Sequence, residues 1–319
     1  MTRILAVDIG TSRIKCAVFE ENGGMTHLLS RRLNRAASPE LQDAEEWFAV
    51  TASLLRELTA RAGFAADAVV LTGNMHALLG ISRGGDPVAP ARLWSDNSAC
   101  NESDLLNSRY GKQLLERFGN TSIPLFPLPK MMRMKLFHPE LYSKSVSFLQ
   151  SKDFIAYRLT GRFATDVSDA SGTLAMDLAS GTWAADLLEE LGLDAEKLPE
   201  ILPSTAVCGQ VTASAARLTG LLEGTPVIIG SGDLASAALG GGVNSSTVSL
   251  TLGTAGQLLA CGDPGCGKAL AGRLFIFAHA DPTKELYLGS VPSGGFSFEW
   301  LASLHQISVD DLFRNAAQT

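Results

Sequence analysis

The sequence predicts an α/β protein with two domains, and three observations lead to this prediction. Short apolar runs of strand length are interspersed with longer segments that have the period of an amphipathic helix. The 319 residues are enough for two domains of ordinary size. LAVDIGTSRIKCAVF near the start and LTLGTAGQLLA near residue 250 share one plan, in which two strands flank a turn of Gly, Thr and a small residue.

Composition narrows the classes of function. A hydrophobic content of 46% with 18% charged residues suits a well-packed globular protein. The net charge of −7 lacks the basic character of a nucleic-acid binder, so we expect no nucleic-acid partner. The N-terminal apolar run is too short for a signal peptide, and no stretch is long enough to cross a membrane. We expect a cytoplasmic protein with no membrane partner, whose odd number of cysteines are buried free thiols.

The segment Ile4–Lys15 is predicted to be two strands joined by a tight turn. Gly10 permits the turn and lets a ligand approach the main chain, while Thr11 and Ser12 offer hydroxyls beside free amides, as in a phosphate cradle. Asp8, at the end of the first strand, is placed to meet Mg²⁺. A plain hairpin would explain the same residues, so the turn alone leaves both interpretations open.

Secondary structure in the first part of the chain follows from caps and periodicity. Asp43 and Glu46 form a capping-box pattern at the start of a helix over 43–62. A Pro-rich loop is expected at 122–129. The same signals predict strands at Met25–Leu33, Ala68–Leu71 and Ala77–Ser82, and helices at Asn101–Phe118, Lys130–Phe137, Ser151–Thr160 and Trp183–Leu191.

A segment with two Gly and a Pro, Leu218–Pro226, is predicted to separate the domains, which gives a first domain of residues 1–225 and a second of 226–319. The second is expected to open with a strand at Val227–Ile229 and a helix at Leu234–Leu239. Strands at Thr247–Leu252 and Gln257–Ala260 then flank the second Gly-Thr turn. Two such turns from two domains could hold one polyphosphate from opposite sides.

Two Gly-rich motifs resemble nucleotide-binding fingerprints but fit them poorly. GSGDLA at 230–235 has the Gly spacing of a dinucleotide site, yet no acidic residue stands near position 253, and its own Asp would repel a pyrophosphate. GDPGCGK at 262–268 resembles a P-loop, but Ala269 replaces the Mg²⁺-binding hydroxyl residue, and Pro264 removes an amide. A surface turn is the preferred interpretation of the second motif.

Two polar residues follow predicted strands. His76 comes after a Gly-Asn-Met turn at a strand end, where side chains open into clefts, although an isolated histidine is more often structural. Asp233 is placed to accept a proton from a hydroxyl, and a simple helix cap would explain it equally well.

Taken together, the motifs resemble those of the FGGY carbohydrate kinases, and within them the xylulokinases. The resemblance covers nearly the whole chain, with the motifs in order. It rests on DIGTS at 8–12, GNMHALL at 73–79, LWSDNSA at 93–99, SKDFIAYRLTGRFATDVSDASGTLAMDL at 151–178, GSGDLASAALGGG at 230–242 and SLTLGTAG at 249–256.

The resemblance implies an actin-like ATPase (ribonuclease H-like) fold, in which two α/β domains with mixed central sheets surround a deep cleft. It implies that Asp233 is the catalytic base, acting on D-xylulose held by Met75, His76, Trp94 and Asp96. It further implies ATP and Mg²⁺ as cofactors, with Asp8 as a catalytic residue that organises the metal. The ATP phosphates would be approached by Gly10, Thr11, Ser12, Arg13, Gly253 and Thr254. A homodimer is an expected assembly.

The sequence departs from the family pattern in two places. Arg133 stands where the segment FPLPKMMR usually has a Trp. The sequence ends at Thr319, before the Gly-rich segment that holds adenosine in the family, so we expect a fragment or a naturally short protein. The Met-His pair argues against a glycerol kinase, and SDASG at 168–172 favours xylulose. Gluconate kinases carry a similar Met-His segment, and a sugar-binding homologue without catalysis is a further alternative.

Overall fold

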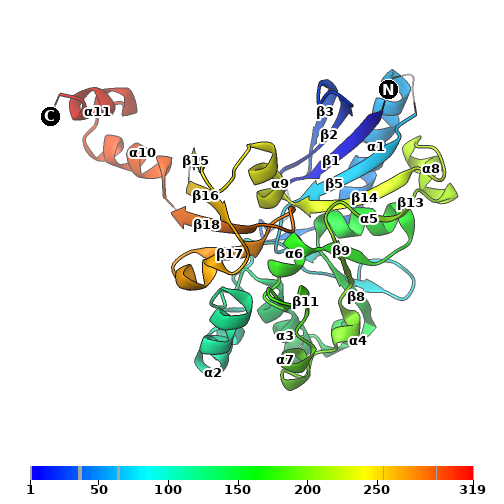
Figure 1. Ribbon diagram of the computed structural model, residues 1–319, viewed down its shortest axis with the longest axis horizontal. Coiled ribbons are helices and arrows are strands. Elements are labelled where there is room, and N and C mark those ends of the chain that lie inside the picture. Colours follow the sequence, from blue (N-terminus) through cyan, green and yellow to red (C-terminus); the bar gives the residue numbers. More distant parts are fainter. Residues whose placement is uncertain (1, 35–37, 63–64, 254, 292, 319) are drawn as a thin grey trace.

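A six-stranded mixed sheet forms the first half of the molecule. The computed structural model describes residues 2–34, 38–62, 65–253, 255–291 and 293–318 (Figure 1). The strand order is β13-β14-β5-β1-β2-β3; β14, β5 and β1 are parallel, and the outer pairings are antiparallel. The strands are β1 Arg3–Ile9, β2 Arg13–Glu20, β3 Met25–Arg32, β5 Ala68–Gly73, β13 Val207–Gln210 and β14 Pro226–Gly232.

Because side chains alternate along each strand, this sheet has a closed face, which is packed into the core, and an open face, which is partly exposed. In β1, Leu5, Val7 and Ile9 are buried, whereas Asp8 lies on the opposite, partly exposed face. Helices α1 (Ala44–Ala62), α5 (Ser151–Thr160) and α8 (Ala213–Thr219) pack together and cover the closed face. The Asp8 side chain, one residue before the end of β1, therefore faces away from the main core.

A layer of short elements lies below the first sheet in Figure 1. A two-stranded ladder pairs β6 with β8, and β4 pairs with β7. Three helices, α2, α3 and α7, surround a second apolar core together with parts of the second sheet. The elements of this layer are β4 Leu41–Gln42, β6 Leu79–Ser82, β7 Ala91–Arg92, α2 Cys100–Phe118, α3 Pro127–Phe137, α4 Pro139–Lys144, β8 Ser145–Leu149, β9 Ala164–Asp166, α6 Val167–Ser171, β10 Met176–Asp177, β11 Thr182–Trp183, α7 Ala185–Glu190 and β12 Glu200–Leu202.

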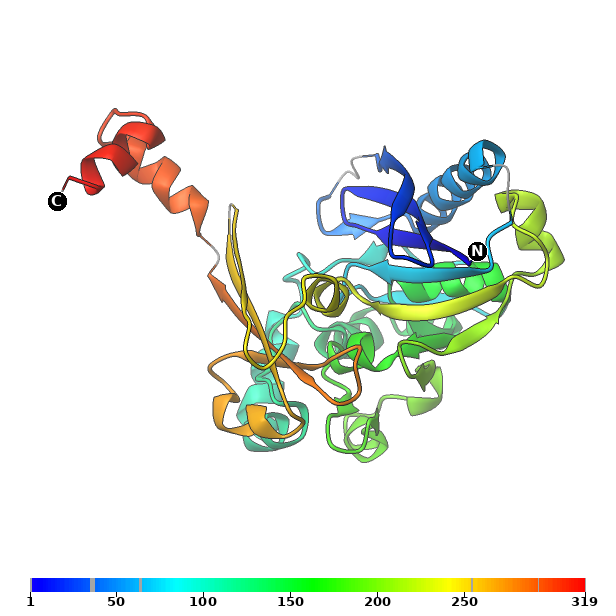
Figure 2. The same cartoon turned by 45° about the horizontal axis from the view of Figure 1, so that its top comes forward.

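The second sheet is antiparallel throughout the described residues, with the order β15-β16-β18-β17. Its strands are β15 Ser249–Leu252, β16 Gly256–Gly262, β17 Phe275–Ala278 and β18 Glu285–Val291, and α9 (Asp233–Gly240) connects it to β14. Helices α10 (Gly295–Leu304) and α11 (Val309–Ala316) extend from β18 away from the rest of the molecule, as both views show (Figures 1 and 2). Among the described helices, none is both long and apolar enough to span a membrane.

The structure confirms most of the predicted elements and corrects several. The helix at Ser151–Thr160 is confirmed to the residue, with Gly161 at φ +77 as its end. Helix α3 begins at Pro127 rather than at residue 130, because proline is tolerated in the first turn of a helix. The capping box at α1 is only half formed: Asp43 accepts from Glu45 N, while Glu46 accepts from Asn34 N.

The position of β14 in the structure differs from the one that the predicted domain division assumed. This strand was expected to open the second domain, yet it pairs with β5 inside the first sheet. The Gly-rich segment before it is the connection from α8 to β14 within one sheet. We therefore propose a boundary after α9, between residues 240 and 249, in place of residues 225 and 226.

All five cysteines are free, as the sequence predicts. The expectation that they are buried is correct for Cys16, Cys208 and Cys261 and wrong for Cys100 and Cys266, which are exposed.

Candidate functional site

The turn between β1 and β2 requires a glycine at its first position. Gly10 N donates to Arg13 O at 3.1 Å, which closes the turn. A Cβ on Gly10 would lie 2.8 Å from Arg13 O, closer than side chains tolerate. The backbone geometry that the sequence predicts for this turn is therefore present.

Side chains from other elements hold this turn in place. Gln42 Nε2 donates to Thr11 O, and Trp94 Nε1 donates to Thr11 Oγ1 at 3.1 Å. Leu33 N donates to Ser12 O at 3.1 Å. Trp94, which the sequence assigned to substrate binding, thus lies against the predicted phosphate turn.

His76 has a backbone conformation that is uncommon for a residue with a side chain. Its φ of +66 places it in the left-handed region, where Gln150 Oε1 accepts its N–H at 2.6 Å. Its Nδ1 lies 2.8 Å from Gly172 O, which can only accept, so Nδ1 carries the proton and Nε2 is left as an acceptor. Burial lowers the pKa of His76 to about 4, which keeps the ring neutral at neutral pH. The ring packs against Phe126 and Phe277, at centroid distances of 5.2 and 5.7 Å.

Asp233 begins α9, directly after β14. Although the residue is exposed to the cavity, the surrounding protein removes much of its solvent and raises its pKa to about 6, and the nearby Asp8 carboxylate adds to the effect. The glycines before it have a packing role: a Cβ on Gly230, which has φ +68, would lie 1.5 Å from Leu71 O. Close packing of β14 against β5 explains the Gly spacing that resembles a dinucleotide fingerprint.

One cavity of about 380 Å³ collects five of the predicted site residues. It lies between the two sheets and receives Gln257 and Ser290 from the second one. Its size is in the range of small-molecule sites. The predicted residues that line it are Thr11, Met75, His76, Trp94 and Asp233. A carboxylate, a neutral imidazole and a hydroxyl thus face a common space suited to a small polar molecule.

Asp96 is not among the residues that line this cavity. Its side chain is buried, with Oδ2 2.9 Å from Arg92 Nη1 and Oδ1 accepting from Ser98 N at 2.8 Å. Burial opposes ionisation, but the Ser98 hydrogen bonds and the Arg92 guanidinium hold the pKa of Asp96 below its ordinary value. In this structure Asp96 fixes the loop that carries Trp94.

Among the described residues, the other predicted nucleotide-binding positions, Gly10, Ser12, Arg13 and Gly253, do not line that cavity. Ser12 and Arg13 are exposed at the first turn, and Gly253 is exposed at the second. Gly253 N donates to Ala255 O at 2.9 Å, and Gly295 N donates to Gly253 O at 2.6 Å. Thr254 lies outside the described residues.

The Asp8 carboxylate suits a hydrated divalent cation. It is partly exposed, with Lys15 Nζ 2.9 Å from Oδ2, and its charge raises the pKa of Asp233. Two carboxylates that repel one another are a suitable environment for a cation. In the part of the chain that the structure describes, no group of three or more His, Cys, Asp or Glu residues could hold a metal. Mg²⁺ is commonly held by one or two carboxylates together with waters and substrate phosphates.

Sequence reasoning gave no role to Lys130, which joins two of the predicted segments. Its side chain is 1% exposed, and Nζ donates to His76 O at 2.9 Å and to Leu93 O at 2.6 Å. Burial lowers its pKa to about 7, although the Asp96 carboxylate opposes the shift. The sequence does carry one signal for this role, because Lys130 stands between prolines and methionines. A cation in such an apolar segment needs buried hydrogen-bond acceptors.

Comparison with known proteins places these features in a family. The model of the FGGY family of carbohydrate kinases, N-terminal domain, matches residues 3–240. Xylulose kinase of Bacillus subtilis is 30% identical over 307 residues, which are 94% of this chain and 61% of that protein. The chain therefore spans about three fifths of the length of this curated relative.

Solved structures give the same result for the fold. The crystal structure of xylulose kinase from Rhodospirillum rubrum has a TM-score of 0.88 and 27% identity, covering 95% of this chain and 64% of that one. Gluconate kinase from Lactobacillus acidophilus has a TM-score of 0.84 and 25% identity, covering 94% and 61%. The predicted actin-like ATPase fold is confirmed.

Proposed function

The chain belongs to the FGGY family of carbohydrate kinases, and we propose that it phosphorylates a terminal hydroxyl of D-xylulose with ATP, giving D-xylulose 5-phosphate. The observation that carries the proposal is the shared cavity. It brings Asp233 together with His76 and with Thr11 of the first turn. An acceptor for a proton, a group that binds hydroxyls and a phosphate turn are the parts that such a reaction needs.

In this proposal Asp233 is the catalytic base. Phosphoryl transfer depends mainly on alignment and charge neutralisation, so a weak base is sufficient. A carboxyl group with a pKa of about 6 is mostly ionised at neutral pH and can take the proton of the attacking hydroxyl. Its position at the end of β14 aims it into the cavity from the first sheet.

Met75, His76 and Trp94 hold the sugar. Nε2 of the neutral His76 accepts a hydrogen bond from a sugar hydroxyl, because its Nδ1–H is already used by Gly172 O. Trp94 offers an apolar face beside it and uses its N–H on Thr11. Asp96 contributes indirectly, by fixing the Trp94 loop through Arg92.

The phosphates of ATP lie between the two Gly-Thr turns. Gly10, Thr11, Ser12 and Arg13 approach them from the first sheet, and Gly253 and Thr254 from the second. Asp8 holds Mg²⁺ through water or directly, and the Lys15 ammonium beside it adds positive charge. When bound, Mg²⁺ supplies neutralisation of the phosphate oxygens.

We further propose a cytoplasmic location, consistent with ATP use and free thiols, and a homodimer as the assembly.

Gluconate is the second candidate substrate. The structural similarity to a gluconate kinase and the MHALL segment favour it. The cavity offers His76 Nε2 and Trp94 to either molecule, so discrimination must come from binding measurements.

The test is a substrate panel. The protein, in the longest form in which its source produces it, is assayed for ADP release with D-xylulose, D-ribulose, gluconate and glycerol, and sugar binding to the 319-residue chain is measured by calorimetry. We expect xylulose to give the highest kcat/KM. A higher value for gluconate would overturn the choice of substrate. Sugar binding without turnover of any substrate would indicate a sugar-binding homologue and overturn the kinase assignment.

A further inference from the structure

A buried ionic cluster lies next to the cavity and contains none of the residues given a role above. Lys152 Nζ is 2.7 Å from Asp153 Oδ1, 3.0 Å from Asp166 Oδ1 and 3.1 Å from Asp169 Oδ2, and no side chain of the four is more than 1% exposed. A buried ion pair adds little stability relative to apolar residues of similar volume. The three carboxylates around the Lys152 ammonium therefore point to a role in positioning neighbouring residues rather than in stabilising the whole fold.

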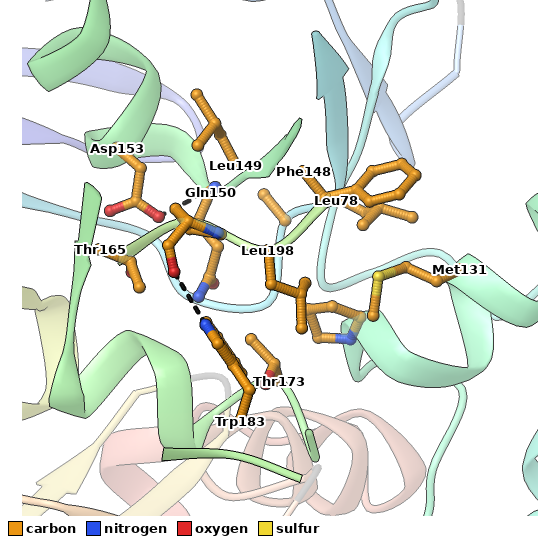
Figure 3. A pocket seen from close by; sticks show the side chains of 13 residues that line it. Leu78, Met131, Phe148, Leu149, Gln150, Asp153, Thr165, Thr173, Trp183 and Leu198 are labelled. Atoms are coloured by element: carbon orange, nitrogen blue, oxygen red, sulfur yellow. Dashed lines mark hydrogen bonds between the residues drawn. The ribbon is translucent and has the colours of Figure 1, made fainter. Parts of the chain in front are cut away.

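One branch of hydrogen bonds leads from this cluster to the sugar-binding loop. Gln150 N donates to Asp153 Oδ2 at 3.2 Å (Figure 3), and Gln150 Nε2 donates to Asp169 O at 2.7 Å. The same side chain accepts from His76 N at 2.6 Å through Oε1. Gln150 therefore connects the cluster to His76, a residue with a left-handed backbone.

A second branch leads to the base. Ser168 Oγ donates to Asp166 Oδ2 at 2.7 Å and accepts from Gly232 N at 2.9 Å. Ser204 Oγ donates to the same carboxylate oxygen at 2.6 Å, and Ser204 O accepts from Gly230 N at 3.1 Å. Both glycines before Asp233 are thus tied to Asp166.

The cluster also touches the site directly. A Cβ on Gly232 would lie 2.8 Å from Asp169 Oδ1 and 2.7 Å from Met75 Cγ, so the Asp169 carboxyl packs against the backbone next to Asp233. Burial raises the pKa of Asp169 well above its ordinary value despite the Lys152 ammonium.

We propose that the Lys152 cluster, with Gln150 and Ser168 as its two branches, is a positioning network that fixes the separation between the sugar held at His76 and the base Asp233. The inference rests on the proposed function. Proton transfer needs the base within hydrogen-bond reach of the hydroxyl, and a displacement of about 1 Å can cost about 100-fold in rate. The left-handed His76 and the glycines flanking Ser231 give little rigidity of their own, so support must come from their neighbours.

The two branches predict different kinetic defects. Ser168→Ala cuts the branch to the base and should lower kcat about 10- to 100-fold while the KM for xylulose stays within about twofold. Gln150→Met cuts the branch to His76 and should weaken calorimetric xylulose binding by about tenfold with a smaller effect on kcat. Ser147→Ala is the matched control, because Ser147 is a buried serine whose Oγ has no hydrogen-bond partner. It should behave as the wild type.

Each of the following outcomes would overturn the network. Ser168→Ala with the kcat of Ser147→Ala would show that the branch to the base has no role in positioning. Equal losses of kcat and binding in both branch variants, or a change in melting temperature alone, would indicate a merely structural cluster. A wild-type protein that phosphorylates no sugar would instead remove the proposed function, and the network with it. An active wild type with an unaffected Ser168→Ala removes only the network.

Discussion

The hairpins β1–β2 and β15–β16 share one local plan but have very different surroundings. In β1, Leu5 and Val7 are at most 1% exposed, whereas in β15 Leu250 and Leu252 are 62% and 65% exposed. The turn of the first hairpin is held by Gln42 and Trp94 from other elements. A shared sequence pattern therefore does not bring the same packing, and rigidity depends on the elements that surround each hairpin. On this account the first sheet supplies the fixed part of the site.

The largest expected difference between the two regions concerns a lysine in a buried ionic cluster and a lysine in a solvent-accessible ion pair. Lys152→Met leaves three buried carboxylates with no ammonium, and should reduce the free energy of unfolding by about 3–5 kcal/mol. Lys284 pairs with Asp263 at 2.7 Å, but Asp263 is 73% exposed and solvent screens the pair, so Lys284→Met should change the free energy of unfolding far less. Urea denaturation of the two variants measures both values. Similar losses would break the comparison.

The next difference concerns leucines of the two sheets. Leu71 in β5 is 1% exposed, and Leu71→Ala should cost about 2–5 kcal/mol because it leaves a cavity in the first core. Leu250→Ala, in the exposed part of β15, should change stability by about 0.5 kcal/mol or less. Thermal melts of the pair check this prediction. A large loss in Leu250→Ala would mean that β15 is packed in solution by a partner or a second copy of the chain.

The carboxyl groups of the two regions should differ in their pH dependence. Desolvation by the surrounding protein raises the pKa of Asp233 to about 6, whereas hydrogen bonds from Thr283 lower the pKa of Asp281 in the second region. Because the base must be ionised, kcat/KM should fall about tenfold per pH unit below pH 6. Xylulose affinity should stay constant from about pH 5.5 to about 6.5, since His76 with a pKa of about 4 remains neutral and Lys130 with a pKa of about 7 remains largely charged. A rate profile that is flat down to pH 5 would contradict the assignment.

The smallest expected effect comes from one bond that holds the first turn. Trp94→Phe removes the indole donor to Thr11 Oγ1 while keeping an aromatic face. The loss of one partly exposed hydrogen bond should reduce kcat/KM about three- to tenfold, corresponding to about 0.5–1.5 kcal/mol. Steady-state kinetics at varied ATP and xylulose measure the change. Trp183→Phe, whose Nε1 donates to Pro199 O away from the site, is the control.

The sequence was sufficient for features that depend on neighbouring residues. The Gly10 turn, helix 151–160 and the approach of His76, Trp94 and Asp233 to one cavity follow from local patterns and from the family resemblance. Their fine geometry could not be predicted. Asp96, for example, is buried in an ion pair with Arg92, and the LWSDNSA motif does not include Arg92.

Other features depend on long-range pairing and stayed hidden for that reason. Lys130 bonds carbonyl groups 54 and 37 residues away, and no periodicity marks such acceptors. Similarly, β14 joins the first sheet through β5, where Val227 pairs with Val69, and the composition shift before it could not show this long-range pairing. The Lys152 cluster could not be predicted either, because in the sequence its carboxylates look like ordinary polar residues.

The most direct test of the account is the isosteric variant Asp233→Asn, assayed with D-xylulose and ATP alongside calorimetric xylulose binding. It removes the proton acceptor while keeping the shape and the position at the start of α9. The account predicts a loss of kcat of at least about 1,000-fold, with xylulose binding within about threefold of the wild type. Turnover close to that of the wild type would contradict the central claim that Asp233 takes the proton of the sugar hydroxyl.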